Sequence, residues 1–108
     1  MAEQQASWHR VAALSEVPEG EAMPVRIGET QIALCRIGET LHAFENVCPH
    51  AYALLSDGFV EDGEIECPLH AARFEIATGR CIAPPADRDL AIYPVRVVGD
   101  EVFVGVNI

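Results

Sequence analysis

The sequence predicts a single all-β domain, an antiparallel sandwich or partly open barrel with a loop-rich insertion. Short runs rich in Val and Ile alternate with Gly-containing turns, and no stretch keeps a helical period with caps. The segment from Cys48 to about Ala86 is richer in Gly, Pro and Asp than its flanks, which is typical of loops. With 108 residues, half of them hydrophobic, the chain has the size of one domain that buries a core without disulfide bonds.

The first half of the chain predicts two consecutive β-hairpins. The runs AMPVRIG, TQIALCRIG and TLHAFEN are rich in strand-forming residues, and Gly28-Glu29 and Gly38-Glu39 separate them. The tetrapeptide IGET occurs in both places and therefore marks two similar turns. Before them, LSEVPEG allows a single helical turn.

Further strands are predicted within and after the insertion. FVEDGEIEC is a hairpin with Asp62-Gly63 at its turn, and ARFEIATG is a strand that runs into a turn. Near the C-terminus, AIYPVRVVGDEVFVGV places Gly99-Asp100 between two Val-rich strands. The two Cys/His pairs, CPH and CPLH, consequently lie where loops leave strands, as a site built from four converging side chains requires.

The charge balance excludes some classes of partner. Lys and Arg number 7 against 17 Asp and Glu, a formal net charge of -10, so nucleic acids and anionic membranes would repel this chain. Its partners should be basic, or small and neutral, although acidity also serves solubility alone. The N-terminus lacks the pattern of a signal peptide, and no run approaches the roughly 20 apolar residues of a membrane span. We expect a cytoplasmic protein.

Four cysteines in a reducing compartment indicate metal binding or burial rather than disulfide bonds. Cys35 lies in an apolar strand and Cys81 follows a turn without a partner at ligand spacing, so both are interpreted as structural. Cys48 and Cys67 each have a histidine within reach. A Cys2His2 zinc site is an alternative, but zinc fingers place the two cysteines together before the two histidines, and often use a helix that is not predicted here.

The order Cys-x-His, 16 intervening residues, then Cys-x-x-His resembles that of the Rieske iron-sulfur proteins. The resemblance implies one [2Fe-2S] cluster, with Cys48 and Cys67 as ligands of the inner iron and His50 and His70 as ligands of the outer iron. Each motif also has the proline that the family carries, and the similarity continues through SDG at 56–58, F-x-x-x-TG at 74–79 and two prolines at 84–85.

The same resemblance implies the organisation of the domain. The Rieske fold has a β base, here residues 1–42 and 87–108, into which a cluster-binding subdomain is inserted, here residues 43–86. Replacing two thiolates by neutral imidazoles raises the potential above that of all-cysteine clusters.

Four positions indicate where the potential lies within the Rieske range. High-potential members have a disulfide between the two loops, and a serine and a tyrosine whose hydroxyls bond cluster sulfurs. This chain has Ala53 and Leu69 in place of the cysteines, Ala72 in place of the serine and Phe74 in place of the tyrosine. We therefore predict a low potential, on the order of -100 to -200 mV.

The chain most resembles the ferredoxins of bacterial multicomponent aromatic-ring dioxygenases. This implies a one-electron carrier between a flavin reductase and the terminal oxygenase, and not an enzyme itself. We expect a monomer. An oxygenase needs a second iron held by two histidines and a carboxylate, and only His9 and His42 remain. His9 is expected in an exposed N-terminal segment, and His42 in a strand.

The surroundings of the cluster histidines suggest a docking surface. An apolar rim is expected around the outer iron, and Asp57, Glu61 and Asp62 could steer the protein toward basic partners. The rim residues are Ala51, Tyr52, Leu69, Pro84 and Pro85. Two alternatives stay open: a Rieske-like small subunit of an assimilatory nitrite reductase, and a zinc-stabilised interaction module.

Overall fold

The computed structural model describes residues 7–49, 53–69, 72–83 and 88–106. Within these ranges the chain is all-β, with two single 3-10 turns as its helical segments, which confirms the predicted fold class. The elements in chain order are β1 (Ser7–Ala13), η1 (Leu14–Glu16), β2 (Met23–Ile27), β3 (Thr30–Ile37), β4 (Thr40–Glu45), η2 (Leu55–Asp57), β5 (Phe59–Glu61), β6 (Glu64–Glu66), β7 (Arg73–Glu75), β8 (Cys81–Ala83), β9 (Ile92–Tyr93), β10 (Val95–Val98) and β11 (Glu101–Val106).

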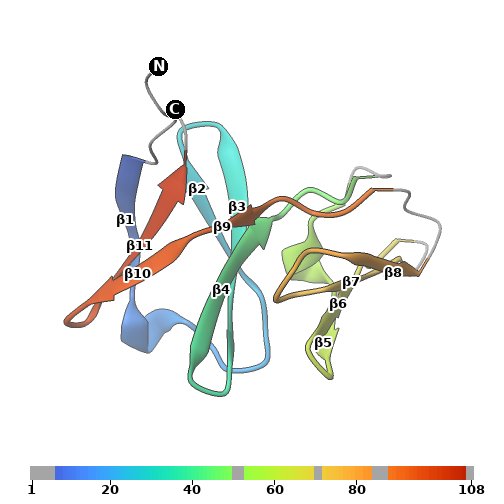
Figure 1. Cartoon of the computed structure of the whole chain (residues 1–108), viewed down its shortest axis with the longest axis horizontal. Helices are drawn as coiled ribbons and strands as arrows, with labels where there is room; N and C mark the ends of the chain where they lie inside the picture. The colour runs from blue at the N-terminus through green and yellow to red at the C-terminus, as the bar shows by residue number, and fades with distance from the viewer. Residues whose placement is uncertain (1–6, 50–52, 70–71, 84–87, 107–108) are drawn as a thin grey trace.

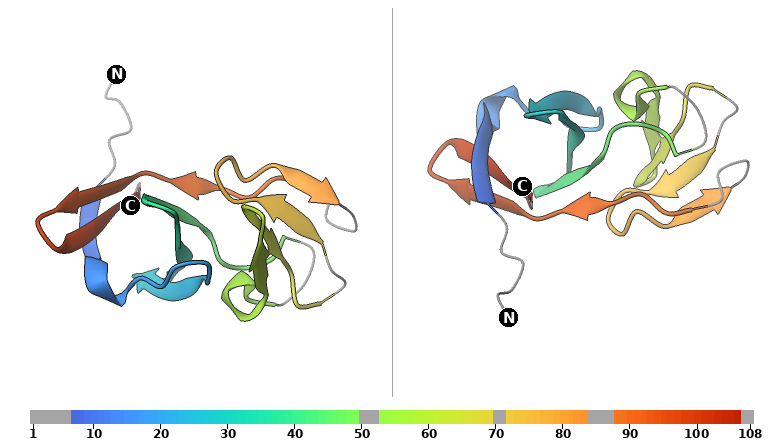
Figure 2. Two further views of the ribbon diagram at one scale, coloured as in Figure 1. Left: turned by 90° about the horizontal axis from the view of Figure 1, so that it is seen from below. Right: turned by 90° about the horizontal axis from the view of Figure 1, so that it is seen from above.

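The strands form three antiparallel sheets (Figure 1). Their orders are β1-β11-β10, β2-β3-β4-β9 and β5-β6-β7-β8. The first two sheets face each other and form the larger part of the molecule, while β5–β8 lie beside them (Figure 2). No helix in the described ranges is long and apolar enough to span a bilayer.

The predicted hairpins are confirmed, and their turns explain the glycine positions. β2, β3 and β4 are joined by the two IGET turns, and β5 and β6 by Asp62-Gly63. Asp62 and Gly63 have φ angles of 55° and 76°. Two successive positive φ angles match the twist of a two-residue hairpin, and Asp-Gly is one of the few pairs that tolerate them. The helical turn in LSEVPEG is the 3-10 turn η1.

Two features of the base differ from the sequence-based expectation. The segment around His9 is exposed at Trp8 and Arg10, as expected, but it forms strand β1, and His9 itself, opposite Val104 of β11, is half-buried. A bulge between Arg10 and Ala12 interrupts the alternation that would have indicated this strand. The run AIYPVRVV is also two strands, because the chain passes from the β4 sheet to the β11 sheet at Pro94.

Strand β3 is shared by two hydrophobic clusters. Ile32 and Leu34 face the cluster within the base, whereas Ala33 and Cys35 face the cluster between the base and β5–β8. All four are 0% exposed, so the run IALC is continuously apolar because both faces of the strand are buried. Cys35 is therefore packed in a core, as predicted. β4 runs to Glu45, across the boundary at residue 42, and the insertion as a unit stays a prediction.

Candidate metal centre

Two loops of matching construction begin at the predicted cysteine ligands. The backbone N–H of Cys48 donates to the carbonyl oxygen of Ala53 at 2.9 Å, and the N–H of Cys67 donates to that of Ala72 at 2.8 Å. Each hydrogen bond joins a cysteine to the residue five positions later and closes the neck of its loop. The two loops thus have equivalent closures, although one motif is Cys-x-His and the other Cys-x-x-His.

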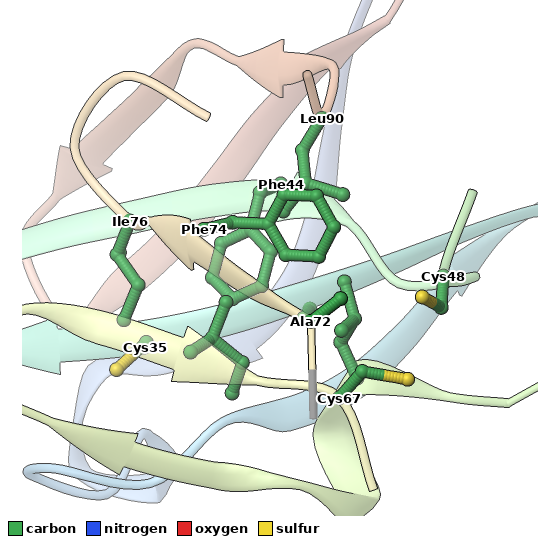
Figure 3. Close-up of a cluster of buried hydrophobic side chains, with 11 residues drawn as sticks. Cys35, Phe44, Cys48, Cys67, Ala72, Phe74, Ile76 and Leu90 are labelled. Atoms are coloured by element: carbon green, nitrogen blue, oxygen red, sulfur yellow. The ribbon is translucent and has the colours of Figure 1, made fainter. Parts of the chain in front are cut away.

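The structure brings the two cysteine side chains into one buried cluster. Cys48 is 2% exposed and Cys67 is 1% exposed, and both pack with Ala72 and Phe74 (Figure 3). The two cysteines lie at the same end of this cluster, with Cys35 further along it. Two buried thiols at the necks of paired loops form a donor set that suits iron in an iron-sulfur cluster, since thiolates are soft ligands.

The other two predicted ligands, His50 and His70, lie outside the described residues. The same holds for four residues of the predicted apolar rim, Ala51, Tyr52, Pro84 and Pro85. The fifth, Leu69, is 46% exposed. The structure thus describes the two predicted cysteine ligands, and the assignment of all four residues as ligands stays a prediction from the sequence motif.

A buried amide that the sequence analysis missed supports the first loop. Asn46 is 0% exposed and is the one buried polar residue among those described. Its Oδ1 accepts a hydrogen bond from the N–H of Ser56 at 2.7 Å, and its Nδ2 donates to the Ser56 Oγ at 3.0 Å. The available signal was an isolated polar residue at the end of a buried strand, two positions before a ligand motif.

Ion pairs support the second loop and the segment before β9. On β7, the Arg73 guanidinium donates to carboxylates of Glu64 and Glu66 on β6, at 2.8 Å each. Arg88 pairs with Glu45 at the end of β4, at 3.1 and 2.8 Å, and Glu45 also accepts the N–H of Ala91. Cross-strand register places Arg73 opposite Glu66, which sequence spacing in the hairpin alone does not reveal.

The four positions that bear on the potential divide by burial. Ala72 and Phe74 are 0% exposed and belong to the cluster that contains both cysteines. Ala53 is half-buried and Leu69 is exposed, and both line an open, mainly apolar hollow of about 490 Å³ between the loops. The other lining residues are Gln31, Val47, Leu54, Asp57 and Pro68.

The remaining cysteines and histidines have different surroundings. Burial, with a smaller contribution from Glu19, raises the pKa of the Cys35 thiol to about 11, so this thiol stays protonated at neutral pH. Cys81, on β8, is half-buried and packs against the same cluster. His42 lies on β4, as predicted, opposite Cys35, and burial lowers its pKa. Among the described residues, Cys48 and Cys67 share the closure by a backbone hydrogen bond to the residue five positions later, whereas the N–H of Cys81 donates to the Asp89 carboxylate at 2.8 Å.

Acidic side chains surround this part of the molecule. Asp57, Glu61 and Asp62 are exposed around η2 and the β5–β6 turn, and none of them forms a salt bridge within the described part of the chain. The nearby Arg73 is engaged by two glutamates. The exposed carboxylates are thus available for long-range attraction of a basic surface.

Comparisons with known proteins identify similar sequences. A family model described as the Rieske [2Fe-2S] domain matches residues 7–94. The ferredoxin component of a naphthalene 1,2-dioxygenase system from Pseudomonas aeruginosa is 38% identical, over 93% of this chain and 96% of the relative. The ferredoxin subunit of an anthranilate 1,2-dioxygenase from Burkholderia cepacia is 41% identical, over 94% of both chains.

Solved structures of ferredoxins are also similar to this chain. The ferredoxin of carbazole 1,9a-dioxygenase from Nocardioides aromaticivorans IC177 has a TM-score of 0.86 and 34% identity, over 91% of this chain and 96% of that one. A ferredoxin chain in a complex of reduced oxygenase and oxidised ferredoxin of carbazole 1,9a-dioxygenase gives 0.84 and 34%, over 91% and 92%. A putative NADH-dependent nitrite reductase small subunit from Mycobacterium tuberculosis gives 0.81 and 26%, over 93% and 95%.

Proposed function

The chain belongs to the Rieske [2Fe-2S] family, and we propose that it holds its cluster through Cys48, Cys67, His50 and His70. The observation that carries this assignment is the pair of matched loops, each closed by the N–H of a buried cysteine. When bound, the cluster accepts and releases one electron at a time. The protein supplies two thiolates from inside the core and two imidazoles from the loops, and its buried apolar residues keep water away from the thiolate side.

The protein is an electron carrier, the ferredoxin component of an aromatic-ring dioxygenase system, rather than an oxygenase. We propose that its electrons come from a flavin reductase in the cytoplasm and go to the terminal oxygenase. The relatives support this because this chain covers almost their whole length, so the comparison applies to complete ferredoxin components.

The acidic surface and the hollow between the loops support docking to a basic partner. Leu69 and Asp57 line the same hollow, and Glu61 and Asp62 extend the negative charge along the β5–β6 hairpin. A partner surface with a small apolar projection and a basic surround would complement this region in shape and charge. We assign this surface to the oxygenase and the reductase alike.

The nitrite reductase alternative shares the fold but has less support. The small subunit from Mycobacterium tuberculosis is 26% identical, compared with 38% and 41% for the two ferredoxin relatives. This chain also has all four cysteines and histidines of the ligand motif. The zinc alternative is not supported, because the matching family model is that of a [2Fe-2S] domain.

The ligand assignment can be tested with the four cysteines of the chain. Cys48→Ala and Cys67→Ala should each abolish the visible absorption and the EPR signal of the reduced protein, whereas Cys35→Ala and Cys81→Ala should retain both. His50→Ala and His70→Ala should lose the mixed-ligand spectrum. Retention of a normal spectrum in Cys48→Ala, or bound zinc in place of iron and sulfide in the wild type, would refute the assignment.

The carrier role needs a separate assay. The purified protein, a flavin reductase with NADH and a naphthalene-type oxygenase should together convert substrate, and omission of this protein should stop turnover. Reduction of the oxygenase at the same rate without it would contradict the role, even if the cluster is present.

A further inference from the structure

A hydrogen-bonded contact joins the stem of the first loop to the turn η2. Asn46, two residues before Cys48, makes both side-chain hydrogen bonds to Ser56, at 2.7 and 3.0 Å. Its backbone carbonyl also accepts the N–H of Leu55 at 2.7 Å. Three hydrogen bonds thus fix residue 46 against residues 55 and 56, and a fourth, from the Asn46 N–H to the Gln31 carbonyl at 3.1 Å, ties it to β3 of the base.

A second contact joins η2 to the stem of the second loop. The N–H of Gly58 closes η2 on the Leu55 carbonyl at 2.8 Å, and the Gly58 backbone lies directly on the carbonyl of Glu66. A Cβ at this glycine would be 2.0 Å from the Glu66 oxygen and 3.2 Å from the Leu55 oxygen. The φ of Gly58 is −92°, an ordinary value, so space rather than backbone conformation requires glycine here.

The two contacts form one continuous connection between the ligand loops, which we call the strut (Asn46, Ser56, Gly58 and Glu66). Its first residue is two positions before Cys48, and its last is directly before Cys67. Both ends therefore bear on the cysteine backbones, through short and mostly buried contacts. These strut residues are shielded from solvent: Asn46 is buried, and Ser56 and Gly58 are half-buried.

We propose that Asn46 and Gly58 are positioning residues that set the separation of the two cysteine ligands, and through it the spectrum, the potential and the retention of the cluster. This inference rests on the proposed function. Metal ligands must be held to within about 0.5 Å of their working geometry, and groups that hold them affect the metal although they do not touch it. The Asn46 amide suits this role because both of its polar groups are paired, which leaves it one orientation.

Asn46→Leu is the decisive variant, since it keeps the approximate volume and removes both side-chain bonds. We expect altered EPR g values, a displaced midpoint potential, and release of iron to a chelator roughly 10- to 100-fold faster than in the wild type. Val104→Ala is the matched control: Val104 is also 0% exposed but belongs to the other cluster, within the base. It should lower the melting temperature and leave g values and potential unchanged.

Two further variants keep the proposal testable if Asn46→Leu does not fold. Ser56→Ala removes the side-chain bond at 3.0 Å and keeps the backbone bond at 2.7 Å, so it should give the same shifts at smaller amplitude. Gly58→Ala displaces Glu66 and should also alter the g values. The proposal would be wrong if Ser56→Ala and Gly58→Ala kept wild-type g values and potential and released iron no faster than Val104→Ala. Failure of the proposed function would instead show as a wild-type protein without iron and sulfide.

Discussion

The prediction that follows most directly from the buried side of the centre concerns the reduction potential. Ala72 and Phe74 are fully buried in the hydrophobic cluster that contains Cys48 and Cys67, and neither side chain can donate a hydrogen bond. We expect a wild-type potential on the order of -100 to -200 mV, and an upward shift in Ala72→Ser, in Phe74→Tyr and in the double variant.

The size of the shift follows from hydrogen-bond energetics. A hydrogen bond to a charged group contributes roughly 1.5–3 kcal/mol, and only the part that grows on reduction changes the potential. If about two-thirds of the lower value grows, each hydroxyl stabilises the reduced state by roughly 1 kcal/mol, or about 40 mV for one electron. The double variant should then lie roughly 80 mV above the wild type, provided that the two hydroxyls act independently.

The assay is a mediated redox titration followed by EPR, with circular dichroism to confirm folding. Phe44→Tyr is the control, because Phe44 is equally buried in the same cluster but lies on β4 of the base. A wild-type potential well above 0 mV would refute the argument from Ala72 and Phe74. An equal shift in Phe44→Tyr would show that general polarity, and not a bond to the centre, is responsible.

Three other predictions concern charge, protonation and packing. Electron transfer to the oxygenase should slow by roughly tenfold or more between 0.01 M and 1 M salt, because the screening length falls from about 30 Å to 3 Å. The double variant Glu61→Gln with Asp62→Asn should reduce this dependence. Stopped-flow rates that do not change with salt concentration would contradict the prediction. The stability of the wild type should fall as pH rises from about 9 toward 11. The pKa of the Cys35 thiol is about 11 in the folded protein, against an ordinary value of 9.0. The thiol therefore stays protonated in the folded state over this range while it ionises in the unfolded state. Denaturation of Cys35→Ala over the same pH range should lack that component, and an identical pH profile would count against it. Gly79→Ala should destabilise the protein by roughly 1–3 kcal/mol or more, because Gly79 has a φ of +80° and an added Cβ would lie 2.3 Å from the Leu90 carbonyl oxygen. An unchanged melting temperature would contradict this prediction.

Local turn chemistry explains which parts of the fold were predictable. The hairpins at Gly28, Gly38 and Asp62-Gly63 depend on residues that are adjacent in sequence, and all of them are confirmed. Strand β1 depends instead on β11 at the other end of the chain, and its bulge disrupts the alternation. The change of sheet at Pro94 likewise follows from the packing of the two base sheets, which a run of apolar residues does not encode.

The same distinction applies to the site. The spacing of the motif predicted Cys48 and Cys67, because each cysteine lies within three residues of a histidine in the sequence. Asn46 escaped notice since its partner Ser56 lies ten positions away and their contact exists only once the first loop has closed. Gly58 belonged to the SDG segment that resembles the family, and the structure supplies its physical reason, the close approach to Glu66.

The arrangement separates the residues that tune the centre from those that meet a partner. Ala72 and Phe74 are fully buried, so changes there can alter the energy of the iron-sulfur cluster without changing the exposed side chains. Leu69 and Asp57 are exposed beside the hollow, so changes there can alter docking while the buried surroundings stay the same. Because the first set is buried and the second is exposed, a carrier of this design can keep one potential while its docking surface is adapted to different oxygenases.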